Sequence, residues 1–239
     1  MTHPFSTIQI SLISSRILHN LAQMRVLVCN FCAKVGRSKR EFMKNPFDCL
    51  FVRERHVCPW WLCFTFDNLI RKLLHNPENI LGPYVHEGDT VLDIGPGMGY
   101  FSIPLARMVG DGGRVIAADV QAPMLAALRK RARKAGLEGR IVPHLCEAES
   151  IGVSEPIDFA LAFWMVHEVP NQTKFFHEIR SLLKPEGKLL LAEPTMHVTR
   201  AMFEETLQRA GEAGFAVTGN PKIFMSRTAL LSLRDGRAG

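Results

Sequence analysis

The chain has 239 residues, 47% of them hydrophobic, and carries a formal net charge of +6 at pH 7. Such a chain can bury a substantial core, and its length suits one α/β domain with an appendage. No hydrophobic run approaches the roughly 18 residues needed to cross a bilayer, which argues against a membrane-spanning protein. We therefore expect a soluble, cytoplasmic protein.

The positive charge is concentrated at the amino terminus. Residues 1–40 contain six of the 29 basic residues and no acidic residue, so the remaining 23 basic residues balance the 23 acidic ones. The basic run at 129–134 is expected to be the solvated face of a helix. Because the rest of the chain has no charge excess, we do not expect nucleic acid as a partner.

Residues 1–42 form a basic segment that lacks the hydrophobic stretch and cleavage site of a secretory signal. This segment fits a targeting sequence, a disordered arm, or sequence upstream of a true translation start at Met24 or Met43. Cys29 and Cys32 have the spacing of a zinc thiolate pair, but no second pair completes a site. We expect no metal and reduced cysteines.

Residues 43–85 are expected to form a helical cover ahead of the main domain. Aromatic residues and cysteines are concentrated at 56–66, just before a predicted helix at 67–75. Trp60 and Trp61 are predicted to line an apolar or cation-binding substrate pocket. Ordinary packing of the cover is the alternative.

A glycine-rich loop follows the first predicted strand, residues 90–94. Gly95, Gly97 and Gly99 remove side chains where a backbone passes close to a ligand, and they permit positive φ. A dinucleotide fingerprint, G-x-G-x-x-G, would need a third glycine where this chain has Tyr100. The loop therefore indicates a nucleotide cofactor and argues against NAD.

The pattern D-x-G-x-G-x-G at residues 93–99 resembles motif I of the class I S-adenosylmethionine-dependent methyltransferases. Four later segments follow at this family's spacing: an acid-terminated strand at 114–119, a strand at 140–145 before acidic residues, a strand at 157–163, and a helix, Pro-Gly turn and strand ending at 194. The resemblance covers about residues 78–230. It is to the small-molecule branch, which includes ubiquinone/menaquinone and arsenite methyltransferases, and it implies S-adenosyl-L-methionine as cofactor and a small-molecule methyl acceptor.

The same resemblance implies which residues contact the cofactor. Asp93 would orient the glycine loop and interact with the amino acid end of the cofactor, and Asp119 would accept hydrogen bonds from the ribose hydroxyls. Glu147 would contact the adenine amino group, with Glu149 as the register alternative. The predicted cofactor-binding residues are Asp93, Gly95, Gly97, Gly99, Asp119, Val120, Glu147 and Phe163.

Methyl transfer is an in-line displacement that depends on alignment in a dry pocket, and a general base can assist it. Such a base would lie on the loops that follow the fourth and fifth strands. His167 is the best candidate because its intrinsic pKa is near neutral, with Glu168 beside it; a purely loop-fixing histidine is the alternative. Glu193 is predicted either to contact substrate or to support a residue that does, and His197 lies in the same loop.

The alternation of strands with helical patterns near 100–109, 122–136 and 171–184 indicates βαβ units in a parallel sheet. A helix at 199–214 and terminal strands at 215–217 and 222–225 complete the pattern. With the family resemblance, the expected fold is α/β, a Rossmann-like, doubly wound, mostly parallel seven-stranded sheet with an antiparallel last strand. The methyltransferase domain is expected at 86–230, followed by a tail at 231–239.

Other functions stay open. A methyltransferase-like domain could act as a non-catalytic binding or interaction module, and an NAD-dependent oxidoreductase is a further alternative that Tyr100 weakens. Residues 163–166 lack the Asp/Asn-Pro-Pro-aromatic tetrapeptide of the amino-methyltransferases of nucleic acids. Cysteine-based arsenite chemistry through Cys58, Cys63 and Cys146 is a minor alternative. The acceptor atom, the pathway and the oligomeric state are not predicted.

Overall fold

The computed structural model describes residues 74–234. The predicted basic segment 1–42, most of the predicted cover at 43–85 with Trp60 and Trp61, and the last five residues lie outside the described residues. The helices are α5 (Pro77–Leu81), α6 (Ser102–Met108), α7 (Ala122–Lys134), α8 (Gln172–Leu182) and α9 (Arg200–Glu212), with a 3₁₀ turn, η1, at Val166–Glu168. The strands are β1 (Thr90–Ile94), β2 (Arg114–Asp119), β3 (Ile141–Leu145), β4 (Ile157–Phe163), β5 (Leu183–Pro194), β6 (Phe215–Gly219) and β7 (Ser226–Leu233).

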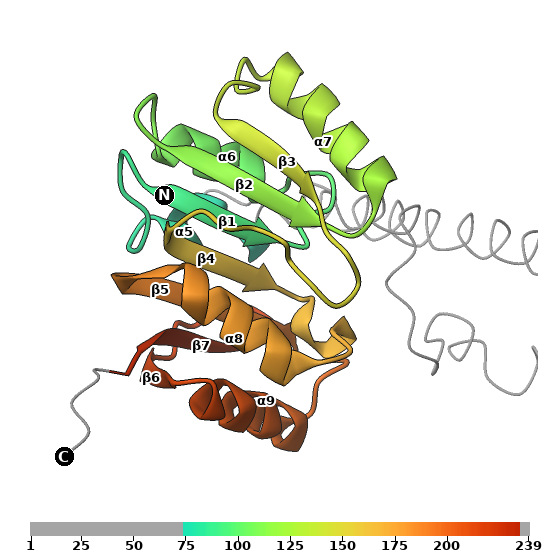
Figure 1. Cartoon of the computed structure of the whole chain (residues 1–239). Helices are drawn as coiled ribbons and strands as arrows, with labels where there is room; N and C mark the ends of the chain where they lie inside the picture. Colours follow the sequence, from blue (N-terminus) through green and yellow to red (C-terminus); the bar gives the residue numbers. More distant parts are fainter. Residues whose placement is uncertain (1–73, 235–239) are drawn as a thin grey trace, which may run out of the picture. The chain divides into compact units, whose positions relative to one another are not determined.

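All seven strands form one sheet in the order β3-β2-β1-β4-β5-β7-β6 (Figure 1). The strands from β1 to β5 pair in parallel, and β7 runs antiparallel to both β5 and β6. The predicted fold class, with its antiparallel last strand, is therefore confirmed. The strand order reverses between β1 and β4, and in such sheets the carboxyl ends at this switch point flank a ligand crevice.

Helices cover both faces of the sheet. Phe176 and Ile179 of α8 pack with Phe203 of α9 on one face, and Leu105 of α6 packs with Leu128 of α7 on the other. In Figure 1, α8 and α9 lie in front of the sheet and α6 lies behind it. Because successive strand residues point to opposite faces, strands that are covered on both faces read as continuous hydrophobic runs.

The last strand lies later in the chain than predicted. Residues 222–225, expected as a strand, form part of the connection between β6 and β7, and β7 runs from Ser226 to Leu233, past the expected domain end at 230. The hydrophobic pattern was misleading because Ile223 is buried in the core from within a connection. Met225, with φ of 51°, is in the left-handed region, which no regular strand adopts.

The fifth strand also begins earlier than expected. The predicted Pro-Gly turn is included in β5, and the pairing with β4 shifts register between Ile157 and Phe159. Ile157 is paired with Leu183, whereas Phe159 is already paired with Lys188. The intervening residues therefore bulge out of the ladder between α8 and the buried part of β5.

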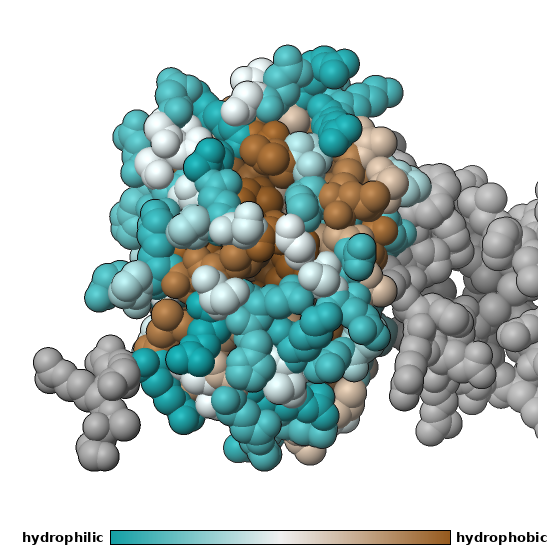
Figure 2. Space-filling model, in the orientation of Figure 1, coloured by the Kyte–Doolittle hydropathy of each residue, from teal (hydrophilic) through white to brown (hydrophobic). Residues whose placement is uncertain are grey.

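The connection between β3 and β4 contains no helix, although helices follow β1, β2, β4 and β5. Val142 and Leu145 of β3 are 47% and 57% exposed. Figure 2 shows hydrophobic surface over this part of the sheet, surrounded by hydrophilic residues. Among the described residues, no helix is long and hydrophobic enough to cross a membrane.

Gly113, immediately before β2, is required by close packing. A Cβ at this position would lie 2.5 Å from the carbonyl oxygen of Asp89 and 2.6 Å from the Cβ of Val109. We predict that Gly113→Ala lowers the free energy of unfolding by about 1–3 kcal/mol, because the backbone must shift to admit the methyl group. Chemical denaturation measures this loss. Gly139→Ala is the control, since a Cβ there meets nothing within 4 Å; equal losses in the two variants would contradict the packing argument.

Candidate active site

The glycine loop lies at the carboxyl end of β1, at the switch point of the sheet. Gly95 and Gly97 have φ values of 67° and 55°, which side chains rarely allow. A Cβ on Gly95 would also lie 3.2 Å from Met165, in the segment that follows β4. A Cβ on Gly97 would meet nothing within 4 Å, so the backbone of the loop is open on that side. The loop can therefore admit a ligand close to its backbone.

Asp93 lies beneath this loop. Its side chain is 2% exposed, and its Oδ2 accepts a hydrogen bond from the hydroxyl of Ser102 at 2.6 Å. Ser102 is the first residue of α6, so Asp93 ties the end of β1 to the helix that follows the glycines. This position fits the predicted role of orienting the loop, while its burial gives no support to direct contact with a cofactor.

Asp119, the last residue of β2, joins the two neighbouring loops. Its Oδ2 accepts a hydrogen bond from the Gly97 N–H at 3.2 Å, and its Oδ1 accepts one from the Gln121 N–H at 2.8 Å. Burial raises the pKa of Asp119, opposed by hydrogen bonds from the backbone of Gln121, Gly97 and Val120. Val120 itself is 41% exposed. The structure thus places the predicted ribose carboxylate directly against the glycine loop.

The segment after β3 carries Glu147 close to this end of the sheet. The backbone N–H of Cys146 donates to the carbonyl of Asp119 at 2.9 Å, and the side chain of Glu147 is exposed.

Burial, with the charges of Asp119 and Glu178, raises the pKa of the Cys146 thiol to about 12. Cys58 and Cys63, the other two cysteines of the arsenite-type alternative, lie outside the described residues. No group of three metal-ligating side chains occurs among residues 74–234.

Phe163, which is predicted to bind the cofactor, packs in an aromatic cluster. Its ring centroid lies 4.5 Å from that of Phe101 and 5.4 Å from that of Trp164, and the residue is 7% exposed. The hydroxyl of Tyr100 donates to the carbonyl of His75 at 2.9 Å, and His75 packs edge-on against Phe163. Tyr100 and Phe101 directly follow Gly99, so this cluster anchors the end of the glycine loop.

Trp164 follows β4 in a strained conformation. Its φ is 60°, an arrangement that costs a bulky residue about 1–3 kcal/mol and recurs at functional sites. Its indole N–H donates to the hydroxyl of Ser226 at 2.9 Å, and its backbone N–H donates to the carbonyl of Ala192 at 2.7 Å. These two contacts hold the turn that leads into η1.

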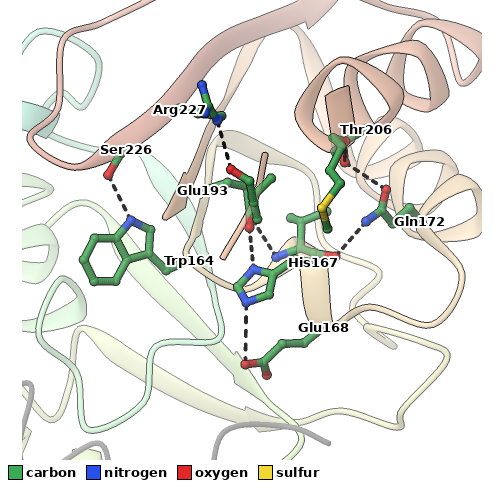
Figure 3. Close-up of polar contacts among 11 residues, drawn as sticks. Trp164, His167, Glu168, Gln172, Glu193, Thr206, Ser226 and Arg227 are labelled. Carbon is green, nitrogen blue, oxygen red and sulfur yellow. Dashed lines mark hydrogen bonds and ion pairs between the residues drawn. The ribbon is translucent and has the colours of Figure 1, made fainter. Parts of the chain in front are cut away.

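His167 lies in η1, between two carboxylates (Figure 3). Its Nδ1 is hydrogen-bonded to Oε2 of Glu193, and its Nε2 lies 4.0 Å from Oε1 of Glu168. A carboxylate can only accept a hydrogen bond, so Nδ1 carries the proton, and Nε2 of the neutral ring is the atom that can accept one.

Glu193 is not exposed at the surface of the site. It is 1% exposed, and its Oε1 accepts a hydrogen bond from the backbone N–H of Val166 at 2.8 Å. Its two oxygens therefore hold the η1 backbone and the His167 ring. The prediction that Glu193 lines the substrate pocket is not supported, whereas the alternative, in which it supports another residue, agrees with these contacts.

The protonation of His167 is controlled by its carboxylate neighbours. Burial alone would lower the pKa of His167, but the hydrogen bond and charge of Glu193, together with the charge of Glu168, raise it above its ordinary value. The ring of His197 stacks on that of His167 with centroids 6.1 Å apart. Burial and the charge of His167 lower the pKa of His197. The two stacked rings are therefore driven toward opposite protonation states.

We predict that Glu193→Gln lowers the pKa of His167 toward 6.5, because the variant removes the buried charge that stabilises the imidazolium. In the wild type this raised pKa stabilises the fold at acidic pH, and that contribution is lost as pH rises through the pKa of the folded state. An NMR titration of the His167 ring, assigned with His167→Gln, measures the shift. Glu212→Gln, on the exposed side of α9, is the matched control. An unchanged pKa in Glu193→Gln would contradict the electrostatic account.

A cavity of about 300 Å³ lies elsewhere, between α5 and the β6–β7 connection. It is lined by Leu74, Asn76, Asn79, Ile80, Tyr84, Pro221, Lys222, Ile223 and Phe224, and so by none of the predicted site residues. The candidate site is therefore formed by the loops at the switch point of the sheet, and it does not coincide with this cavity.

Two residues that position the site by hydrogen bonds, Ser102 and Gln172, were not predicted from the sequence. Ser102 lies three residues after Gly99 and could have been found as a hydroxyl at the start of a helix. Gln172 donates to the carbonyl of Val166 at 3.0 Å, but a glutamine that opens an amphipathic helix carries no local signal of such a contact.

Comparison with known proteins identifies similar domains. A family model described as "Methyltransferase domain" matches residues 85–219. The ubiquinone/menaquinone biosynthesis C-methyltransferase UbiE of Enterobacter sp. (strain 638) is 33% identical over 110 residues, which are 46% of this chain and 44% of that protein. The corresponding protein of Cellvibrio japonicus is 34% identical over 110 residues, with the same coverage. The matched region therefore spans less than half the length of these relatives.

Solved structures share the fold. A SAM-dependent methyltransferase from Aquifex aeolicus superposes with a TM-score of 0.66 at 24% identity, covering 75% of this chain and 100% of that one. A putative S-adenosylmethionine-dependent methyltransferase from Methanococcus maripaludis gives a TM-score of 0.65 at 17% identity, covering 75% and 94%. At these identities the likeness concerns the fold alone.

Proposed function

The chain belongs to the methyltransferase domain family, in the class I S-adenosylmethionine-dependent group, and we propose that it transfers the methyl group of S-adenosylmethionine to a small-molecule acceptor. The observation that carries the proposal is the contact between Asp119 and Gly97. It joins an acid at the end of β2 to an open glycine loop at the switch point of the sheet.

The residues at this point fit the cofactor. Gly97 has open space beside its backbone, and the Asp119 carboxylate offers acceptors for ribose hydroxyls. Glu147, exposed on the loop after β3, would bind the adenine amino group, and Asp93 would keep the glycine loop in position from beneath. When bound, S-adenosylmethionine supplies a sulfonium methyl group that a nucleophile can attack in line.

In this proposal His167 is the general base. Glu193 holds Nδ1, which leaves Nε2 to take a proton from the acceptor as the methyl group is transferred. Because the carboxylates raise the pKa of His167, the neutral ring that can act as base accumulates only as pH rises through that pKa. The rate of transfer should therefore increase with pH across this range.

The acceptor is proposed to be hydrophobic. Trp164 and Met165 follow β4, and Met196, which follows β5, is 65% exposed, so hydrophobic side chains border this end of the sheet. The named relatives are C-methyltransferases of ubiquinone and menaquinone biosynthesis, which makes reduced quinone precursors the first acceptors to test. Burial raises the pKa of the Cys146 thiol, so this residue does not favour an acceptor chemistry that depends on its thiolate.

The test is transfer of a radiolabelled methyl group from S-adenosylmethionine by the full chain. A panel containing a hydrophobic quinol, a small thiol and a water-soluble phenol separates the acceptor classes. We expect label in the organic extract with the quinol. Cofactor binding without transfer to any acceptor in a broad panel would favour the non-catalytic binding module.

A further inference from the structure

We infer that Gln172 is a positioning residue, whose side-chain amide links the η1 turn that carries His167 to helix α9. The inference rests on the proposed function, because it assigns Gln172 a role through the proposed base. Figure 3 shows the chain of contacts from Thr206 through Gln172 to the turn and on to Glu193.

The residue before His167 is held from two sides. The carbonyl of Val166 accepts a hydrogen bond from Nε2 of Gln172 at 3.0 Å, and its N–H donates to Glu193 at 2.8 Å. The side chain of Val166 is fully buried. Within the turn, the Val166 carbonyl also accepts a hydrogen bond from the Val169 N–H at 3.1 Å. A single 3₁₀ turn has few such bonds, so the two outside contacts add to it in fixing where the next residue, His167, lies.

The other end of the Gln172 amide is fixed by α9. Its Oε1 accepts a hydrogen bond from Nη1 of Arg209 at 2.9 Å, and the hydroxyl of Thr206 lies 3.2 Å away. Thr206 is buried, and Arg209 is also paired with Glu205 at 2.6 Å. The Thr206 hydroxyl has one proton, which it shares between Gln172 and the carbonyl of Met202 at 3.1 Å, so Arg209 is the main donor to the amide oxygen. An amide is suited to this position, since one end must donate to a carbonyl while the other accepts.

The position of η1 controls the environment of His167. The charged and titratable groups that face its ring are Glu193 from β5, Glu168 from its own turn and His197 from the loop after β5. Their influence falls with distance and depends on the hydrogen bond between Nδ1 and Glu193. Releasing Val166 on the Gln172 side should therefore loosen this hydrogen bond without touching the glycine loop.

The experiment is an NMR titration of His167 in the full chain, with Gln172→Ala and Gln172→Met compared with the wild type. Methionine keeps the length and apolar stem of glutamine but has neither the donor nor the amide oxygen. Gln172→Met therefore provides a folded sample even if the shorter alanine side chain destabilises the contact between α8 and α9. We expect the pKa of His167 to fall toward its ordinary value in both variants, by less than in Glu193→Gln. Gln208→Ala, which removes an exposed glutamine from α9 that is bonded to Glu212, should leave it unchanged.

Binding of S-adenosylhomocysteine to the same samples, measured by calorimetry, distinguishes failure of the Gln172 inference from failure of the proposed function. We expect equal affinities in wild type, Gln172→Ala and Gln172→Met. Failure of the wild type to bind would overturn the proposed function. Normal binding in all samples, together with an unshifted His167 in the folded Gln172→Met variant, would overturn the inference and leave the proposed function standing.

Discussion

Asp119→Ala is expected to weaken S-adenosylmethionine binding by about 100-fold or more. The carboxylate is the proposed acceptor for the ribose hydroxyls, and hydrogen bonds to a charged group contribute about 1.5–3 kcal/mol each, where 1.4 kcal/mol is tenfold. The variant also removes the acceptor for the Gly97 N–H, which holds the glycine loop against β2. Isothermal titration calorimetry of the full chain measures the loss.

Two further variants test whether the loss of cofactor affinity is due to the missing Asp119 carboxylate. Asp119→Asn keeps one oxygen acceptor and should bind with intermediate affinity. Asp111→Ala removes an acid whose side chain is 92% exposed, and it should bind as the wild type does. If Asp119→Ala bound the cofactor as tightly as Asp111→Ala, the assignment of the ribose site would be wrong.

His167→Gln is expected to lower kcat by about 10²–10⁴, the usual contribution of a general base. Glutamine can still hydrogen-bond to Glu193, but it cannot take a proton from the acceptor. The wild-type rate should rise with pH through the raised pKa of His167, and the variant should lose this dependence. Radiolabel transfer to the acceptor identified in the panel measures both.

Cofactor affinity should be unaffected in His167→Gln, because η1 does not include the glycine loop. His177→Gln, on the exposed side of α8, is the matched control and should keep full activity. A His167→Gln enzyme with an unchanged kcat and pH profile would show that this histidine only fixes its loop.

The fold was predictable where periodicity is strong and the segment is buried. The hydrophobic residues Phe175, Phe176, Ile179 and Leu182 recur at helical spacing and form the buried face of α8. The fourth strand was predicted at its observed bounds because it is almost wholly hydrophobic. The last strand was misplaced because Ile223 and its neighbours look like a strand, although they are part of a connection that contributes to the core.

The site was predictable only where it is local in sequence. The glycines and Asp119 follow directly from strand ends, so their proximity could be expected from a parallel sheet. The burial of Phe163, the position of Glu193 behind His167 and the reach of Gln172 between η1 and α9 are tertiary facts. Each of these contacts joins residues that are far apart in the sequence, so the spacing of hydrophobic residues gives no sign of it.

The most direct test is calorimetric titration of the full chain with S-adenosylmethionine, S-adenosylhomocysteine and NAD in parallel. Binding of the first two without NAD is the expected result, because the glycine loop has Tyr100 where a dinucleotide fingerprint has its third glycine. Binding of NAD alone would contradict the cofactor assignment and with it the proposed methyl transfer.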